Sequence, residues 1–141
     1  MPADTAQLGA IIAAHAHREG PLLPILHDVQ AAFGCVSAEA EADIAHALNL
    51  SRAEVHGVVS FYHDFKPAPD PRPVIKLCRA EACQARGVEA LVAALPAQDR
   101  VRIETVYCLG LCSVGPNAMA GTTLHARLDA SRLSALVEAA S

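Results

Sequence analysis

The stretch that decides the fold is residues 107–116, which read Tyr107-Cys108-Leu109-Gly110-Leu111-Cys112-Ser113-Val114-Gly115-Pro116. This C-x3-C segment follows the β-branched run 101–106, which predicts a strand. An earlier C-x4-C pair, Cys78 and Cys83, follows a second such run, 74–77. Four of the five cysteines therefore stand in two pairs, each in a loop after a predicted strand. Such loops can present thiolate ligands on a rigid scaffold.

Two thiolate pairs suit a [2Fe-2S] cluster, because this cofactor takes four cysteines, two on each iron. Structural zinc also takes four thiolates, but its usual knuckle is C-x2-C or C-x4-C, so a C-x3-C partner is less typical of it. A disulfide framework is less favoured, since no secretory signal is recognised and a fifth cysteine would be left over. The leading hypothesis is a cluster held by Cys78, Cys83, Cys108 and Cys112, with zinc as the alternative.

Composition limits the remaining classes of function. The 141 residues are 52% hydrophobic, enough for one ordinary domain or two small modules, and with no Trp the core should be aliphatic. A net charge of −4 argues against a nucleic-acid partner. The first five residues lack a basic region followed by an apolar run, and no window reaches the roughly 18 apolar residues of a membrane span. We therefore expect a soluble cytoplasmic protein with no direct membrane insertion.

The first half of the chain has helical periodicity. Gly34 is a natural residue for the end of a helix, Ser37 can cap the next one, and Ser51 with Glu54 forms a capping box. These signals predict a small helical bundle in a domain spanning residues 1–66. Its expected helices cover residues 5–17, 21–33 and 38–48, with a fourth beginning at residue 52.

A proline-rich linker, residues 67–73, separates this domain from a second one predicted over residues 74–141. The second domain should contain strands near 73–78 and 101–106 around a helix at about 84–95. Short strands at 118–120 and 123–128 should follow, joined by a turn at Gly121-Thr122, with a last helix from Asp129 or Ala130. A βαβ unit followed by a hairpin and a helix is the thioredoxin-like layout, so the predicted fold class is α+β.

This topology would bring the two cysteine pairs together. The strands of a right-handed βαβ unit are parallel, so the loops after them open at the same end of the sheet. Cys83 is expected just before a helix, whose free N–H groups favour negative charge. Gly110 and Gly115 would let backbone amides approach the sulfur atoms, which influences reduction potential.

The sequence resembles the [2Fe-2S] subunit family of NADH-oxidising complexes, the 24 kDa-type subunit of complex I and its relatives, over nearly its whole length. Besides the cysteine pairs, the residues that carry the resemblance are Leu26-His27-Asp28-Val29-Gln30, Phe33-Gly34 and Val55-His56-Gly57-Val58-Val59-Ser60-Phe61-Tyr62-His63-Asp64-Phe65. The resemblance implies one cluster on Cys78, Cys83, Cys108 and Cys112, in a thioredoxin-like domain preceded by a small helical domain. It also implies docking on a flavoprotein that carries FMN and binds NAD(H).

Within that family, Ser113-Val114-Gly115-Pro116 and the compact chain are most similar to the gamma subunit of a soluble NAD-dependent formate dehydrogenase. Complex I relatives commonly have an Asn-Ala-Pro-like sequence there and a small residue in place of Leu111. The resemblance implies a non-catalytic one-electron carrier, with FMN and NAD(H) only in the partner subunit and the substrate bound by a larger catalytic subunit. The equivalent subunit of complex I or of a bidirectional hydrogenase is the alternative, and a zinc-stabilised adaptor is an alternative of another class.

Other residues that invite a functional reading are better explained by structure. We expect Cys35 to be a buried free thiol rather than a ligand. His15 and His17 are two apart on a helix, so they would chelate poorly and should be solvated. Phe61 and Tyr62 are expected to pack at the domain junction. No nucleophile with a base and an orienting acid is found, so no catalytic residue is predicted.

Overall fold

The computed structural model describes residues 4–141, and the chain divides after Pro71 into two compact units, Met1–Pro71 and Arg72–Ser141. What the sequence predicts for residues 1–3 lies outside the described part. The division falls within the proline-rich stretch, and each unit has its own core. Along residues 4–141, no helix is long and apolar enough to cross a membrane.

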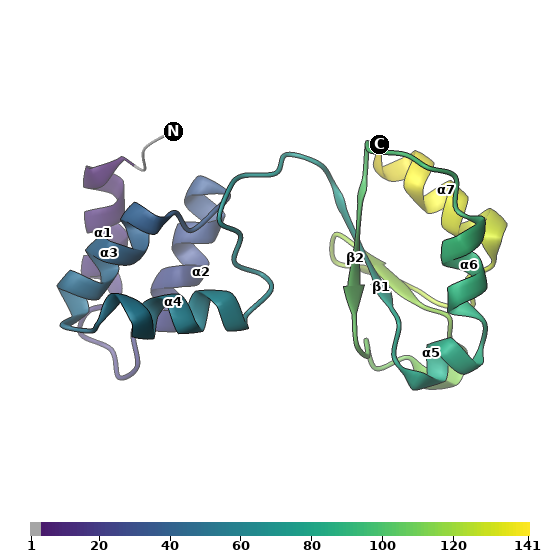
Figure 1. The fold of residues 1–141 in the computed structure, drawn as a ribbon, viewed down its shortest axis with the longest axis horizontal. Coiled ribbons are helices and arrows are strands. Elements are labelled where there is room, and N and C mark those ends of the chain that lie inside the picture. The colour runs from purple at the N-terminus through teal and green to yellow at the C-terminus, as the bar shows by residue number, and fades with distance from the viewer. Residues whose placement is uncertain (1–3) are drawn as a thin grey trace. The chain divides into compact units, whose positions relative to one another are not determined.

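The first unit consists of helices, as predicted (Figure 1). Ser37 Oγ accepts the backbone N–H of Ala40 at 3.2 Å, and Ser51 and Glu54 form the complete capping box. Gly34 ends its helix with a φ of 73°, a left-handed conformation that a residue without Cβ adopts easily. The helices are α1 (Thr5–His15), α2 (Leu22–Phe33), α3 (Ala38–Leu48) and α4 (Arg52–Phe61).

The core of this unit is aliphatic, which agrees with the composition. One buried aromatic residue, Phe65, joins it after α4, and the backbone N–H of Val36 donates to the carbonyl of Lys66 at 2.7 Å. The segment that follows α4 is thus attached to the helical unit. The buried residues are Leu8, Ile25, Leu26, Val29, Val36, Ala40, Ile44, Ala45, Val55, Val59 and Phe65.

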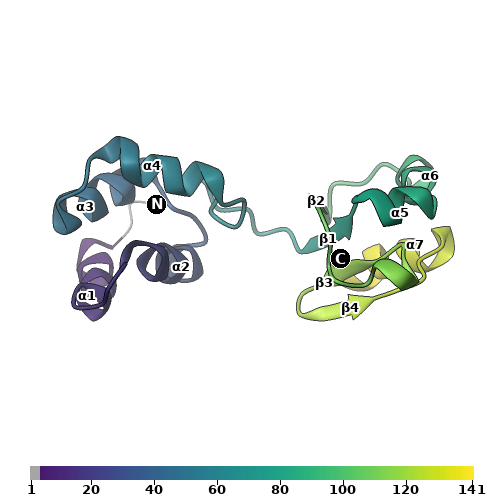
Figure 2. The same ribbon diagram turned by 90° about the horizontal axis from the view of Figure 1, so that it is seen from below.

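The second unit contains a four-stranded mixed sheet in the order β2-β1-β3-β4. The two strands that precede the cysteine loops, β1 and β2, are parallel, and the β1–β3 and β3–β4 pairs are antiparallel, as the thioredoxin-like layout requires. Figures 1 and 2 show α6 and α7 on the same face of this sheet. The elements are β1 (Val74–Cys78), α5 (Glu81–Ala85), α6 (Val88–Ala94), β2 (Arg102–Val106), the 3₁₀ turn η1 (Cys112–Val114), β3 (Ala118–Ala120), β4 (Thr123–His125) and α7 (Ala130–Ala140).

The single helix predicted at 84–95 is wrong, because this segment forms α5 and α6 with a break at Gly87. Gly87 has a φ of 90°, outside the helical region, and its N–H bonds the carbonyl of Gln84 in a tight turn. Helix α5 therefore begins earlier than expected, at Glu81. This shift moves Cys83 from the predicted position before a helix to a position inside one.

The strand predicted at 123–128 is also too long, since β4 ends at His125. The chain then leaves the sheet: the N–H of Arg127 donates to the carbonyl of Val114 at 2.7 Å, and that of Leu128 donates to Pro116 at 3.0 Å. Arg127 has a φ of 50°, which is incompatible with a continuing strand. These bonds attach the start of α7 to the loop that follows the last cysteine.

Candidate metal centre

The first cysteine pair lies inside the core of the second unit. Cys78 is the last residue of β1, and Cys83 lies in the middle of the five-residue helix α5. Their exposed fractions are 2% and 1%. The sequence predicts Cys83 just before the start of a helix, but the structure places it inside the short helix α5.

The second pair is exposed and lies in the loop after β2. Cys108 has a φ of 79°, an uncommon conformation for a residue with a side chain, and Cys112 opens the 3₁₀ turn. The two Sγ atoms are 3.6 Å apart. The left-handed backbone conformation of Cys108 thus occurs in a loop whose two thiol groups are in contact.

The parallel register joins the two loops, as the βαβ topology predicts. Cys78 pairs with Val106, so the carboxyl ends of β1 and β2 are adjacent. The backbone N–H of Cys108 donates to Cys78 Sγ at 3.2 Å, a direct bond between the loops. Folding thus brings together the four cysteines that the sequence singles out.

Nitrogen donors approach several of the sulfur atoms. The N–H of Gly110 lies 3.4 Å from Cys108 Sγ, as expected for a flexible glycine. Gly115 has a different role from the predicted one, because a Cβ there would lie 3.1 Å from Cys83 Sγ. Its missing side chain leaves the space that the Cys83 sulfur needs.

The environments move the thiol pKa values in opposite directions. Burial raises the pKa of Cys78, but the N–H groups of Ala80, Cys108 and Leu109 together lower it below its ordinary value. Burial raises the pKa of Cys83, and its contact with Cys78 raises it further. Each thiolate in such a set is favoured by donors and disfavoured by the negative charge of its neighbours.

The donor set fits a binuclear cluster. Four thiols arranged as two pairs match the ligand requirement of a [2Fe-2S] centre, two to each iron. Among residues 4–141, no group of three or more His, Cys, Asp or Glu side chains is placed to hold one metal ion. Each loop contributes one pair of cysteines, N–H donors lie near their sulfur atoms, and Gly115 leaves space for the Cys83 sulfur.

Asn117 is a contact of the centre that sequence reasoning missed. Its side chain is 1% exposed, and its Nδ2 lies 3.4 Å from Cys83 Sγ and 3.1 Å from the carbonyl oxygen of Leu111. A signal was present in the sequence: a polar residue stands between Gly115-Pro116 and the apolar strand β3. Polar residues at such positions are seldom buried without a partner to bind.

Three predictions about residues outside the centre need correction. Cys35 is half-buried rather than fully buried, because it lies in the short connection between α2 and α3. His15 is not simply solvated, since its Nε2 is 2.6 Å from Asp28 Oδ2, a hydrogen bond that joins α1 to α2. Phe61 and Tyr62 are exposed, by 76% and 40%, and so are not core residues. Phe61 is the last residue of α4, where the side chain can point away from the helical core.

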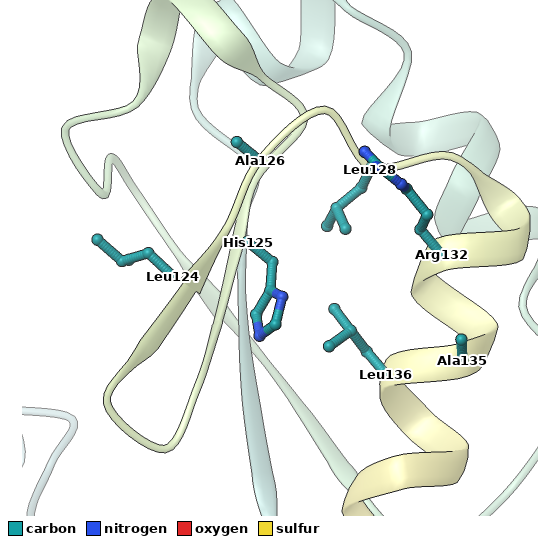
Figure 3. Close-up of a pocket in the computed structure, with 7 residues that line it drawn as sticks. All are labelled: Leu124, His125, Ala126, Leu128, Arg132, Ala135 and Leu136. Atoms are coloured by element: carbon teal, nitrogen blue, oxygen red, sulfur yellow. The ribbon is translucent and has the colours of Figure 1, made fainter.

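A cavity of about 420 Å³ lies away from the cysteines, between β4 and α7. Figure 3 shows His125 and Leu136 pointing into it and Leu124 pointing away. The other lining residues are Ala126, Leu128, Arg132 and Ala135. None of the four cysteines contributes to this space, so it is not part of the candidate metal centre.

Comparison with known proteins gives consistent matches. The family described as "Thioredoxin-like [2Fe-2S] ferredoxin" matches residues 8–141. The HndA subunit of the NADP-reducing hydrogenase of Solidesulfovibrio fructosivorans is 31% identical over 77% of this chain and 70% of its own length. A subunit of the NADH-quinone oxidoreductase of Rhizobium meliloti (strain 1021) is 29% identical over 94% of this chain and 85% of its own.

A solved structure gives the same result. The crystal structure of an NAD⁺-reducing [NiFe]-hydrogenase in the air-oxidized state superposes with a TM-score of 0.62 and 29% identity over 80% of this chain. The match spans 22% of the hydrogenase chain, so the similarity concerns one segment of a larger polypeptide.

Proposed function

Since the chain belongs to the thioredoxin-like [2Fe-2S] ferredoxin family, we propose that Cys78, Cys83, Cys108 and Cys112 are the ligands of its one cluster. The chain is an iron–sulfur electron-transfer subunit of the kind found in NADH-oxidising complexes. The ligand assignment is supported by one observation above all: the backbone N–H of Cys108 donates to Cys78 Sγ at 3.2 Å, so the second cysteine loop lies directly against the Cys78 sulfur.

The bound cluster supplies reversible one-electron chemistry. The residues of this chain determine where an electron can enter or leave. Cys78 and Cys83 are enclosed by the core, whereas Cys108, Cys112 and the neighbouring Tyr107, which is 73% exposed, lie at the surface. We therefore assign electron exchange to the surface formed by residues 107–112, the side from which a redox partner can approach closely.

The proposed partner is a flavoprotein subunit that carries FMN and binds NAD(H), with a larger catalytic subunit in the same complex. The exposed ring of Phe61 at the end of α4 supports a role for the helical unit in binding that partner, because large exposed aromatic side chains are common in interfaces. We keep the cytoplasm as the proposed location, since thiolate-held centres persist in a reducing compartment.

Formate dehydrogenase is the parent complex we propose, on the resemblance of Ser113-Val114-Gly115-Pro116. The relatives found by comparison are subunits of hydrogenases and NADH-quinone oxidoreductases, so these are the competing parents. Co-purification of the chain with its partner subunits, followed by NAD⁺ reduction with formate or with hydrogen as donor, separates a formate dehydrogenase from a hydrogenase. Activity with hydrogen and none with formate would overturn the formate assignment.

Metal analysis of the anaerobically purified chain tests the cluster itself. The expected content is about two irons and about two sulfides per chain, with a brown colour that bleaches on reduction. A colourless protein that contains zinc would instead support the adaptor function. The chain alone should not oxidise NADH, because it lacks a dinucleotide fingerprint. NADH-dependent dye reduction by the isolated chain would contradict the assignment as a carrier.

A further inference from the structure

The segment after the last cysteine contains a polar side chain that the core encloses almost completely. Asn117, 1% exposed, lies between the cis Gly115–Pro116 peptide and strand β3. Its neighbour Ala118 is fully buried and packs in the core of the second unit. An amide in this position requires a reason, because burial of a polar group without full compensation is unfavourable.

Every bond that the structure gives Asn117 leads to a cysteine segment. Its carbonyl oxygen accepts the N–H of Cys78 at 3.1 Å. Its side-chain Nδ2 donates to Cys83 Sγ at 3.4 Å and to the carbonyl of Leu111, directly before Cys112, at 3.1 Å. One residue thus connects the end of β1, helix α5 and the exposed cysteine loop.

The orientation of the amide follows from these partners. A carbonyl oxygen and a sulfur that carries negative charge are both acceptors, so the NH₂ group and not the oxygen must face them. The side-chain oxygen, Oδ1, is buried and has no hydrogen-bond partner within residues 4–141. An unpaired acceptor destabilises the fold. A residue kept only for packing would avoid that loss with an apolar side chain of similar size, so the two donated bonds explain the choice of asparagine.

We propose that Asn117 is a positioning residue for the metal centre, which fixes the two cysteine loops relative to each other and raises the reduction potential through its Nδ2–H···Sγ bond to Cys83. This inference rests on the proposed ligand set. A hydrogen bond to a ligand sulfur stabilises the more negative, reduced state more than the oxidised one. The effect is large when the donor is buried, because solvent does not screen it.

A spectroscopic experiment on the intact chain tests the contact directly. The sequence has two asparagines, Asn49 and Asn117, and Asn49 ends α3 in the other unit. Asn49→Gly suits the left-handed φ of 54° at that position and leaves a single asparagine. Chain labelled with ¹⁵N in the asparagine side chain, with its cluster reduced, should show a ¹⁵N coupling in pulsed EPR. Absence of that coupling in the N49G chain would overturn the proposal.

Electrochemistry tests the consequence. Asn117→Leu keeps the branching at Cγ, although Leu is the larger residue, and removes both N–H donors. It should shift the redox equilibrium of the cluster roughly tenfold towards the oxidised form, about 59 mV for one electron. The control is Val137→Ala, a buried change in α7 that destabilises the unit without removing a hydrogen-bond donor. N117L should shift the potential, whereas V137A should lower stability alone.

The outcomes separate this inference from the proposed function. If the purified wild-type chain contained no iron, the proposed ligand set would be contradicted, and the proposed role of Asn117 would be contradicted as well. Wild-type chain with a cluster and an N117L potential equal to that of V137A would overturn the Asn117 proposal only. Should N117L fail to fold, Asn117→Ser, which is smaller and keeps one donor, takes its place, and the ¹⁵N measurement needs no change at Asn117.

Discussion

The two cysteine pairs of this protein are supported in different ways. Cys78 and Cys83 belong to β1 and α5 and are buried in the same core as Ile75 and Leu77. Cys108 and Cys112 lie on an exposed loop, whose shape depends on a left-handed residue and a 3₁₀ turn. The comparison shows a centre in which one half is fixed by folding and the other is accessible to a partner. Changes in the first half should therefore affect stability and metal binding, and changes in the second should affect metal binding alone.

The largest effect is expected for the buried pair. Cys83→Ser replaces a soft thiolate with a hard hydroxyl oxygen, a poor ligand for iron, so iron content should fall to background. The same change puts a hydroxyl in the core, and it should lower the free energy of unfolding of the metal-free chain by about 1–3 kcal/mol. Iron analysis and urea denaturation measure the two effects. A metal-free C83S chain as stable as wild type would contradict the structural half of this prediction.

A smaller total effect is expected for the exposed pair. Cys112→Ser should lose or severely perturb the cluster, while the free energy of unfolding of the metal-free chain changes by less than about 0.5 kcal/mol, because an exposed side chain contributes little. Cys35→Ser, in the helical unit, is the matched control and should retain the wild-type cluster spectrum. Loss of the cluster in C35S, together with a wild-type cluster spectrum in C112S, would contradict this prediction.

The smallest effect on metal binding concerns the space around Cys83. In Gly115→Ala the new Cβ would lie 3.1 Å from Cys83 Sγ and 3.3 Å from Arg86 Cδ. The Arg86 side chain can move, but the buried sulfur cannot, so we expect a loss of about 1 kcal/mol in stability and a partial loss of iron.

A second glycine provides the control for this change. Gly57→Ala, in α4, meets no atom within 4 Å and should raise stability by about 0.5–1 kcal/mol through helix propensity. Thermal unfolding of both variants checks the opposite signs. If the unfolding temperature shifted in the same direction in both variants, the lack of space for a side chain at Gly115 would not explain the effect.

The elements that the sequence predicted well are those with local determinants. The capping box at Ser51, the cap at Ser37 and the left-handed Gly34 all use residues within a few positions of each other, and the structure confirms them. The pairing of the cysteine loops was also predictable, because parallel strands have their carboxyl ends at one edge of a sheet.

The errors arose where contacts distant in sequence decide the structure. The break at Gly87 lets Cys83 lie within α5, and β4 ends at His125 because Arg127 and Leu128 bond the loop at Val114 and Pro116. Asn117 was missed for the same reason, since its partners are 6 and 34 residues away along the chain. No periodicity within a strand or helix reports such contacts.

The boundary after Pro71 has a consequence for how this protein can be inherited and rearranged. Cys78, Cys83, Cys108, Cys112 and Asn117 all follow that boundary, and the core around them is closed within Arg72–Ser141. Every group that we assign to holding the metal therefore travels with one segment of 70 codons. A gene fusion that joins this segment to a different polypeptide would keep the whole ligand set. The helical unit could then diverge to suit a new partner without altering a single sulfur.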